Sequence, residues 1–262
     1  MVRARKRFGQ HFLSDQDVLS RIVGVMAIKP DDRVLEIGPG RGALTSHLLS
    51  ETDQLDAVEI DRDLVPILSA QFPALKLINA DILNVDLHEL FHRPTRVVGN
   101  LPYNISSPLL LKLADFAKTH PDRFVDGHFM LQKEMAERMS AQPGTKAWGR
   151  LSVIMQLTFS VDHLFDVAPE SFDPPPKVWS SVIRVAPSDT VAKVSPVEMA
   201  AIDEVLRNAF AQRRKRLANA LKTLNIDWSL VDVSPDVRAD DVTLSQYVAL
   251  ARARLNDQEM DS

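Results

Sequence analysis

Apolar runs of strand length alternate with amphipathic, helix-length segments from about residue 15 to residue 160. The strand-like runs cover residues 33–38, 54–59, 76–79, 96–100 and 127–131. Apolar residues at helical spacing fill most of the intervals between them. This alternation is typical of parallel strands joined by helical crossovers. The pattern therefore predicts an α/β fold with a Rossmann-like, mostly parallel sheet.

The pattern changes after residue 159. Two β-like runs, Val161–Val167 and Val178–Val185, flank three prolines at 174–176, which suggests an antiparallel hairpin at the edge of the sheet. Beyond Pro187 the spacing is helical, with helices expected at 196–210, 213–224 and 245–255. We therefore expect a sheet domain over residues 1–187 and a small all-helical C-terminal domain over residues 188–262.

Composition removes several classes of protein. With 262 residues, 45% of them hydrophobic and 25% charged, the chain suits an ordinary globular protein of one or two domains. The absence of cysteine excludes disulfide frameworks, thiolate metal sites and cysteine nucleophiles. Its longest apolar stretches fall far below the roughly 18 residues that a membrane-spanning helix needs. We therefore expect a cytoplasmic protein with no membrane partner and no metal.

The net charge of −4 hides an uneven distribution of basic residues. Residues 1–12 carry four basic residues and no acidic one, and residues 205–224 carry six and none. The other 230 positions hold 21 basic and 35 acidic residues. Clustered lysine and arginine suit phosphate contacts, so the pattern indicates a polyanionic partner held locally. A solvated terminus and a basic helix face would account for the charge equally well.

Chemistry-bearing residues follow the first three strands of the sheet. The first strand runs into a glycine-rich turn with Gly38 and Gly40, where a ligand can approach the backbone closely. The next two strands end near Glu59 and Asp81, where carboxylates suit a ribose diol and an adenine amine. The set indicates an adenosine-containing cofactor. Because Ala43 completes a glycine pattern used for NAD, an NAD-dependent dehydrogenase remains an alternative.

The fourth strand runs directly into Asn100, Leu101, Pro102 and Tyr103. The exocyclic amine of adenine is a poor nucleophile, because its lone pair is delocalised into the ring. Two acceptors, the Asn100 side-chain oxygen and the Leu101 carbonyl, would favour a tetrahedral nitrogen by positioning and electrostatics, without a general base. Pro102 would fix the turn and Tyr103 would stack on the base. A purely structural turn with a buried tyrosine is the alternative.

With these motifs, the chain resembles the small-subunit ribosomal RNA adenine N6-dimethyltransferase family over essentially all its residues. The resemblance rests on residues 6–13 (KRFGQHFL), 36–40 (EIGPG), 59–61 (EID), 100–104 (NLPYN), 129–134 (FMLQKE), 172 and 174–178 (F and PPPKV) and 210–215 (FAQRRK). It implies a class I methyltransferase fold that uses S-adenosylmethionine and releases S-adenosylhomocysteine. It also implies a monomer that dimethylates two adjacent adenosines near the 3′ end of 16S rRNA, in an immature 30S particle during late small-subunit biogenesis.

The resemblance also assigns site residues. It implies cofactor contacts from His11, Leu13, Gly38, Glu59, Asp81, Ile82 and Asn100, and a base slot between Tyr103 and Phe172. His11 stands where asparagine is expected, so its contact is expected through the backbone alone. Candidate RNA-binding residues are Arg5, Lys6, Arg7, Arg150, Lys177, Arg213, Arg214, Lys215 and Arg216. A core position for Phe172 and a solvated face for the basic cluster are the alternatives.

Two further functions fit the same motifs. The macrolide-resistance methyltransferases that act on large-subunit rRNA share the expected fold, although the basic segment at 210–215 looks more like the small-subunit enzymes. A non-catalytic ribosome-assembly factor could retain the methyltransferase shell. The intact acid and asparagine set argues for catalysis, but does not exclude an assembly role beside it.

Overall fold

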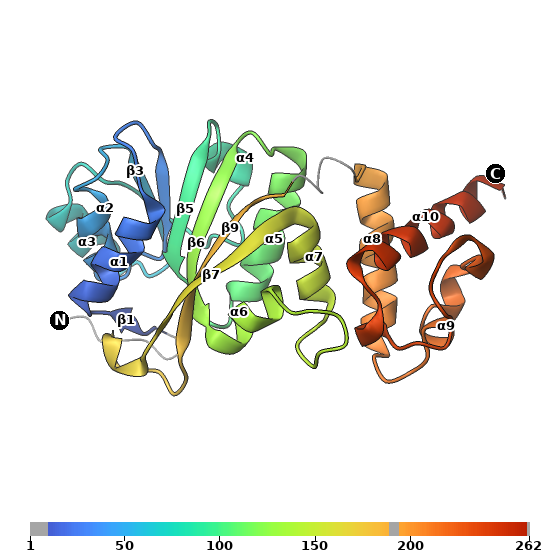
Figure 1. Cartoon of the computed structure of the whole chain (residues 1–262). Helices are drawn as coiled ribbons and strands as arrows, with labels where there is room; N and C mark the ends of the chain where they lie inside the picture. Colours follow the sequence, from blue (N-terminus) through green and yellow to red (C-terminus); the bar gives the residue numbers. More distant parts are fainter. Residues whose placement is uncertain (1–9, 189–193, 261–262) are drawn as a thin grey trace. The chain divides into compact units, whose positions relative to one another are not determined.

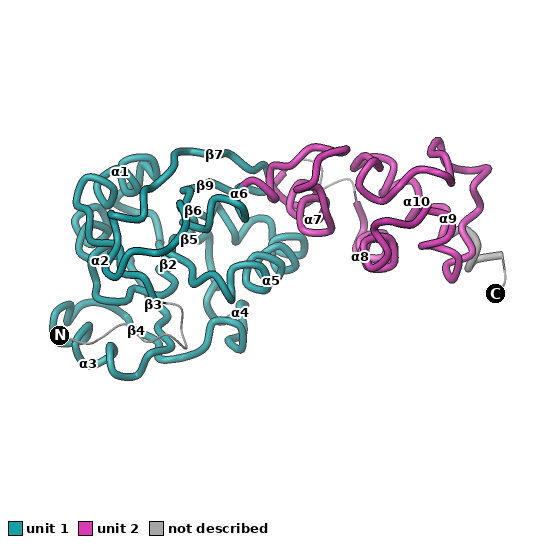
Figure 2. Tube along the Cα trace, turned by 90° about the horizontal axis from the view of Figure 1, so that it is seen from below, with its two compact units in different colours: residues 1–136, 160–187 teal, residues 137–159, 188–262 magenta. Residues whose placement is uncertain are grey.

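The structure is a computed structural model that describes residues 10–188 and 194–260 (Figure 1). It divides into two compact units, one of residues 1–136 and 160–187 and one of residues 137–159 and 188–262 (Figure 2). The chain passes between the units after residues 136, 159 and 187. Residues 137–159, which the sequence pattern placed in the sheet domain, group with the helical unit, and the domain bounds 1–187 and 188–262 stay a prediction.

The first unit is built on a seven-stranded sheet in the order β4-β3-β2-β5-β6-β9-β7. Its strands are β2 (Val34–Ile37), β3 (Leu55–Glu59), β4 (Lys76–Asn79), β5 (Thr95–Asn100), β6 (Phe124–Gln132), β7 (Phe159–Val167) and β9 (Ser180–Pro187). Strands β2 to β6 pair in parallel, and β9 pairs with β6 in antiparallel register. The predicted mixed sheet is confirmed. Chain order reverses at β2, so the carboxyl ends of β2 and β5 border the crevice where such sheets bind ligands.

Helices cover both faces of this sheet. They are α1 (Gln16–Met26), α2 (Ala43–Leu48), α3 (Val65–Gln71), α4 (Leu87–Leu90), α5 (Ser106–Thr119) and α6 (Lys133–Met139). The buried residues of α1 and α2 pack with Val34, Val98 and Met130 in one core cluster. Figure 2 shows α1 and α2 on one side of the row of strands, and α4 and α5 on the other.

A two-stranded antiparallel ladder joins the N-terminal segment to the segment before β9. It consists of β1 (Phe12–Leu13) and β8 (Phe172–Asp173), with Leu13 opposite Phe172. The short helix η2 (Pro169–Ser171) precedes β8, and Ser14 N donates to Ser171 O at 2.9 Å. Strands of two residues show no hydrophobic period, so the sequence pattern did not reveal this ladder.

The second unit is helical. Its elements are α7 (Arg150–Thr158), α8 (Pro196–Ala211), α9 (Leu217–Ala220) and α10 (Leu244–Met260), with the 3₁₀ helices η4 (Lys222–Leu224), η5 (Trp228–Leu230) and η6 (Ala239–Asp241). Helices α7 and α10 pack against α8. The buried Trp148 donates from Nε1 to Val242 O at 3.0 Å. These contacts explain why residues 137–159 belong to the helical unit.

The continuous helix predicted over residues 213–224 is wrong. The structure has a turn after α8, then the four-residue α9 and the short η4. Arg216 is extended and bridges Arg238, while Leu217 N donates to Val237 O at 2.7 Å. Pairing with the distant 235–238 segment therefore replaces the helical hydrogen bonds here. The four basic residues at 213–216 therefore begin on a turn and end at the start of α9.

Candidate active site

The glycine-rich loop joins β2 to α2 and needs glycine for its backbone shape. Gly38, Gly40 and Gly42 have φ of 70°, 60° and 80°, the left-handed region that other residues rarely adopt. A Cβ on Gly40 would also lie 3.0 Å from the Phe12 ring. Gly40 N donates to Glu59 Oε2 at 3.0 Å, so this loop is held against the end of β3.

Glu59 closes β3 and is only 3% exposed. Its second oxygen accepts from Asp61 N at 2.8 Å, so each carboxylate oxygen holds one backbone amide. Burial raises the pKa of Glu59, and the amide hydrogen bonds from Asp61 and Gly40 oppose that rise. A carboxylate oxygen has more than one acceptor position. Glu59 can therefore accept further hydroxyl donors from a ligand.

The loop after β4 is held rigidly from two sides. Asp81 accepts from Leu83 N at 3.0 Å and from Asn84 Nδ2 at 2.9 Å. Lys112 on α5 donates from Nζ to three carbonyls of the same loop, those of residues 82, 83 and 85, at 3.1, 2.8 and 2.5 Å. Burial lowers the pKa of Lys112, and the nearby carboxylates of Asp81 and Asp86 oppose that shift. Sequence reasoning missed Lys112, although a lone lysine inside the apolar run of α5 was a usable signal.

Asn100 ends β5 with its amide held in one orientation. Its Nδ2 donates to His11 O at 2.9 Å. Leu101 N donates to Met130 O at 3.1 Å, which fixes the following peptide. Among the described residues, neither Asn100 Oδ1 nor Leu101 O accepts a hydrogen bond. Two oriented acceptors are thus available at the carboxyl end of β5.

Tyr103 and His11 form an aromatic pair beside these acceptors. Their ring centroids are 5.9 Å apart with an interplanar angle of 26°. The Tyr103 hydroxyl lies 3.4 Å from Ser180 Oγ at the start of β9, and burial raises its pKa. His11 Nδ1 lies 2.7 Å from Pro174 O. The His11 side chain therefore has structural contacts of its own, beyond the backbone role that the sequence suggested.

One cavity of about 260 Å³ unites most of the predicted catalytic and cofactor-binding residues. Its lining includes His11, Gly38, Glu59, Asp81, Ile82, Asn100, Leu101, Pro102 and Tyr103. Leu13 instead lines a neighbouring cavity of about 50 Å³, together with Gly38 and Asn100. Residues as far apart in sequence as His11 and Tyr103 are thus brought to one hollow, which carboxylates and an aromatic ring both line.

Two buried titratable groups border the smaller cavity. Glu36 accepts from Thr45 Oγ1 at 2.6 Å, and burial raises its pKa to about 7. Burial lowers the pKa of His128 to about 4, so its ring is neutral at physiological pH. Neither nitrogen of His128 has a hydrogen-bond partner among the described residues. Sequence reasoning named Glu36 only as part of a motif and did not single out His128.

Phe172 lies in the hydrophobic core. It is 4% exposed and packs in the cluster that contains Leu13, Met130 and Val182. It does not line either cavity described above. A role for Phe172 as the second wall of a base slot stays a prediction.

The candidate RNA-binding residues differ in how their charges are compensated. In the helical unit, Arg150 donates twice to Asp203 Oδ1, at 3.0 and 2.7 Å, and Arg213 and Arg216 pair with Asp240 and Asp236 at 3.4 and 2.9 Å. Lys177, Arg214 and Lys215 are exposed and form no ion pair with any described residue. Arg5, Lys6 and Arg7 lie outside the described residues.

The described residues offer neither a metal site nor a membrane span. No group of three or more His, Asp or Glu side chains within residues 10–188 and 194–260 could hold a metal ion. In the same part of the chain, no helix is both long and apolar enough to cross a membrane.

Comparison with known sequences finds relatives along the whole chain. A model of the family described as ribosomal RNA adenine dimethylase matches residues 1–253. "Ribosomal RNA small subunit methyltransferase A" of Bordetella pertussis is 48% identical over 257 residues, covering 97% of this chain and 95% of that protein. The protein of the same name from Pseudomonas savastanoi pv. phaseolicola is 48% identical over 258 residues, covering 95% and 94%.

Comparison with solved structures finds the same fold. A dimethyladenosine transferase from Plasmodium falciparum has a TM-score of 0.76 and 26% identity, covering 92% of this chain and 96% of that one. The 23S rRNA methyltransferase ErmE has a TM-score of 0.70 and 24% identity, covering 94% and 99%. The likeness to ErmE extends to the fold alone.

Proposed function

Because the chain belongs to the ribosomal RNA adenine dimethylase family, we propose that it dimethylates the N6 amines of two adjacent adenosines near the 3′ end of 16S rRNA. The proposal is supported by the curated relatives of 48% identity, whose name assigns them to the small subunit. The observation that carries the chemistry is the oriented Asn100 amide, whose Nδ2 is held by His11 O at 2.9 Å. Its Oδ1 is thereby presented as an acceptor for an amine.

The residues at the cavity fit S-adenosylmethionine, which supplies an electrophilic methyl group when bound. Gly38 and Gly40 offer close backbone approach, and Glu59 retains acceptor positions for the ribose hydroxyls. Asp81 is half-buried, lies beside Ile82 in the same lining, and can accept from an adenine amine. His11, Leu13 and Asn100 are proposed to complete the contacts. The donor and acceptor set is thus that of an adenosine-binding site.

The target amine is held, in this proposal, by Asn100 Oδ1 and Leu101 O, one acceptor for each of its two hydrogens. Hydrogen bonds to both acceptors favour a tetrahedral nitrogen, which frees the lone pair that the adenine ring otherwise delocalises. The nitrogen gains a methyl group and loses one proton, which passes to solvent. Tyr103 supplies a stacking face, Pro102 shapes the turn, and Phe172 is the proposed opposite wall. Extruding the base from its stack brings the amine to these groups.

RNA contact is proposed for the exposed basic residues Lys177, Arg214 and Lys215, since their charges are uncompensated among the described residues. Arg150, Arg213 and Arg216 can contribute only by sharing or exchanging their aspartate partners. Phosphate contacts hold the substrate without reading its sequence. We assign this rRNA-holding role to Lys177 in the sheet unit and to the basic residues of the helical unit, with Arg5, Lys6 and Arg7 as further proposed contacts. The proposed substrate is an immature 30S particle, bound by a monomer in the cytoplasm, where subunits assemble.

The test is methylation of small-subunit particles that lack the modification, using labelled S-adenosylmethionine and mass spectrometry of the rRNA. We expect N6,N6-dimethyladenosine at two adjacent positions near the 3′ end. Unmodified large-subunit particles are the matched substrate control, and methylation of those particles alone would overturn the proposal. Asn100→Ala should bind small-subunit particles but methylate them at least about a hundredfold more slowly. If this variant fully replaced the wild type in cells, an assembly role without catalysis would be favoured instead.

RNA contact is tested separately by the salt dependence of particle binding. The double variant Arg214→Ala/Lys215→Ala should reduce the slope of log affinity against log salt by about two, one per lost phosphate contact. Lys76→Ala removes an exposed lysine from the amino end of β4, where it pairs with Asp56 at 3.6 Å, and should leave the slope unchanged. Equal slopes for both variants would argue against RNA contact at the turn.

A further inference from the structure

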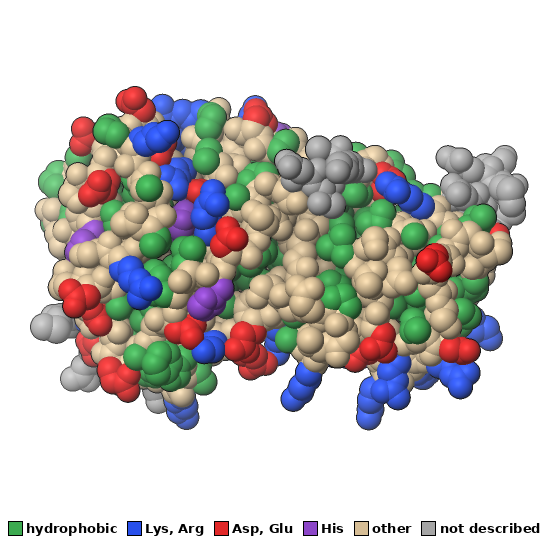
Figure 3. Space-filling model, viewed as in Figure 1, with side chains coloured by type: hydrophobic (Ala, Val, Ile, Leu, Met, Phe, Trp, Pro, Cys, Tyr) green, Lys and Arg blue, Asp and Glu red, His purple; other side chains and the backbone are tan. Residues whose placement is uncertain are grey.

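Trp179 is an exposed tryptophan close to the proposed active site. Its side chain is 51% exposed, whereas Trp148 in the helical unit is 1% exposed. The preceding Val178 is also 43% exposed. In Figure 3, hydrophobic side chains gather at the lower edge of the sheet unit, with basic and acidic side chains around them. Large apolar side chains grouped in solvent usually mark a surface that binds something.

A backbone hydrogen bond holds Trp179 at the carboxyl end of the sheet, where the proposed active site lies. Trp179 O accepts from Lys133 N at 3.0 Å, directly beyond the last paired residues of β6 and β9. The next residue, Ser180, is buried and lies 3.4 Å from the Tyr103 hydroxyl. The indole is therefore presented from an ordered segment, one residue from a group that contacts the proposed base-stacking tyrosine.

Trp179 is placed beside the target-base site rather than in it. Its neighbour Ser180 is 1% exposed and faces Tyr103, while the indole itself faces solvent. Trp179 also does not line the cavity that Asn100 and Tyr103 border. A single bound molecule would consequently contact Asn100 with one part and Trp179 with the part next to it.

The charge beside Trp179 suits a nucleic acid. Lys177 is exposed and has no ion-pair partner among the described residues, in contrast to Lys133, which pairs with Asp166 at 2.6 Å. A planar aromatic face next to an uncompensated cation matches the two parts of a nucleotide, a base that stacks and a phosphate that pairs.

We propose that Trp179 stacks on a base that flanks the target adenosines, while Lys177 contacts a phosphate of the same strand. This inference rests on the proposed function, since it takes single-stranded RNA as the occupant of the surface. The indole would hold the neighbouring nucleotide as the target base leaves its stack. Trp179 is then a residue that binds and positions substrate and takes no part in methyl transfer.

The experiment compares Trp179→Ala, Trp179→Phe and Trp179→Leu, with Val125→Ala as the matched control. Val125 is 43% exposed and lies at the amino end of β6, in the same unit. The first measurement is binding of a short labelled single-stranded RNA with two adjacent adenosines, followed by anisotropy. Loss of one stacked base should weaken binding by Trp179→Ala about tenfold. Trp179→Phe should stay within about threefold of the wild type, and Trp179→Leu should resemble Trp179→Ala.

The second measurement is steady-state methylation of small-subunit particles. Trp179→Ala should raise KM for the particle about tenfold, with kcat, cofactor affinity and melting temperature unchanged. An unchanged KM or an unchanged RNA affinity would overturn the inference. Recovery by leucine as complete as by phenylalanine would also overturn it, because that result indicates an apolar contact with a protein partner.

The RNA-binding and methylation measurements together distinguish failure of this inference from failure of the proposed function. If the wild type fails to methylate particles yet binds RNA through Trp179, the proposed function fails and the RNA contact stands. If the wild type methylates particles and Trp179→Ala does so with unchanged KM, the proposed function stands and the inference fails.

Discussion

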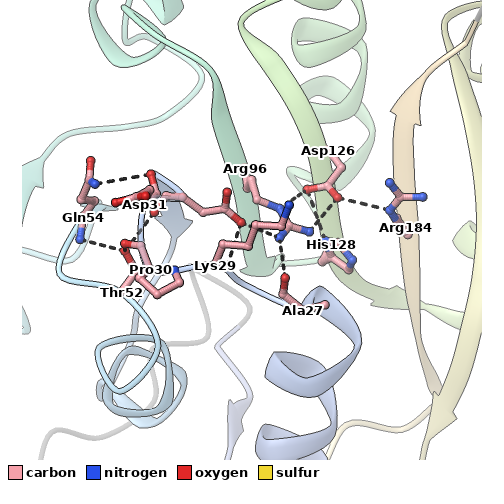
Figure 4. Close-up of polar contacts among 11 residues, drawn as sticks. Ala27, Lys29, Pro30, Asp31, Thr52, Gln54, Arg96, Asp126, His128 and Arg184 are labelled. Atoms are coloured by element: carbon pink, nitrogen blue, oxygen red, sulfur yellow. Dashed lines mark hydrogen bonds and ion pairs between the residues drawn. The ribbon is translucent and has the colours of Figure 1, made fainter.

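The two ends of the same sheet use the same kinds of polar residue in opposite ways. At the amino end, Arg96 holds Asp126 through two nitrogens at 2.9 and 2.8 Å and Asp32 at 3.0 Å, and Arg184 reaches Asp126 at 3.2 Å (Figure 4). Arg33 pairs with Asp56 beside them. There, carboxylates are neutralised by arginine.

At the carboxyl ends of β3, β4 and β5, the polar groups are bonded mainly to the backbone instead. Glu59 and Asp81 accept main-chain amides, and the Asn100 amide donates to a main-chain carbonyl. Ionic partners would consume the acceptors that a ligand needs, whereas backbone partners orient those acceptors and leave further lone pairs available. Charge pairing thus stabilises the amino end of the strands, while preorganised acceptors make the carboxyl end suitable for binding a ligand. Four substitutions test this division.

The largest effect is expected from Asp126→Ala at the amino end. Arg96, whose side chain is 11% exposed, would lose a buried partner that Arg184 also uses. Breaking a buried pair from one side should lower the free energy of unfolding by about 3–5 kcal/mol. Chemical denaturation measures it, and cofactor affinity of the folded protein should not change. Asp162→Ala, which removes an exposed partner of Arg184, is the control and should cost under about 1 kcal/mol. Similar losses for both variants would contradict this account of the amino end.

Asn100→Ala should act on catalysis rather than stability. Removing one preorganised acceptor should lower kcat by about 10²–10³, or about 3–4 kcal/mol in activation free energy. The lost hydrogen bond to His11 O should cost only about 1 kcal/mol of unfolding free energy. Single-turnover methylation and denaturation of the same preparation measure the two effects. A large loss of stability with unchanged kcat would assign Asn100 to structure alone.

Glu36 predicts a pH dependence of stability. Its pKa is about 7 in the folded protein against an ordinary value of 4.5, because it is buried. Below pH 4.5 the carboxyl is protonated in both states. Between pH 4.5 and 7 it ionises in the unfolded chain but stays protonated in the folded protein, so stability should fall across that window by about 3 kcal/mol from this group and level off above pH 7.

Glu36→Gln is the variant that isolates this dependence. Glutamine keeps an acceptor for Thr45 but cannot ionise. The variant should match the wild type near pH 4.5 and exceed its unfolding free energy above pH 7, as measured by denaturation across that range. A difference between the two proteins that does not change with pH would refute a titrating Glu36. His128 is present in both proteins, so its own depressed pKa cancels in the comparison.

Lys112→Met should produce the smallest of the four effects. The variant loses all three carbonyl contacts that hold the 82–85 loop beside Asp81. We expect about tenfold weaker binding of S-adenosylhomocysteine, about 1.4 kcal/mol, by calorimetry. Kcat at saturating cofactor should not change. Lys118→Met on the same helix is the control and should bind normally. Equal affinities for both variants would show that the loop is held without Lys112.

Much of the fold was predictable because it depends on local patterns. The runs ending near Glu59, Asn79 and Asn100 became β3, β4 and β5 within a residue or so. Parallel strands share one carboxyl edge, so residues at the ends of consecutive strands meet regardless of how the loops pack. The helix expected over 213–224 failed for the opposite reason, since its backbone pairs with residues 235–238.

The sequence alone therefore determined the fold class and the residue types around the cavity, because hydrophobic periodicity and strand ends are local properties of the chain. Only the tertiary structure decided which way the Asn100 amide faces, since its partner His11 is 89 residues away. Packing likewise decided that Phe172 is buried and that Trp179 is exposed. It also decided that aspartates compensate Arg150 and Arg216, whereas Lys177 has no ion pair within residues 10–188 and 194–260. Hydrogen bonds and ion pairs between distant residues depend on which groups folding brings together, and no local pattern encodes that.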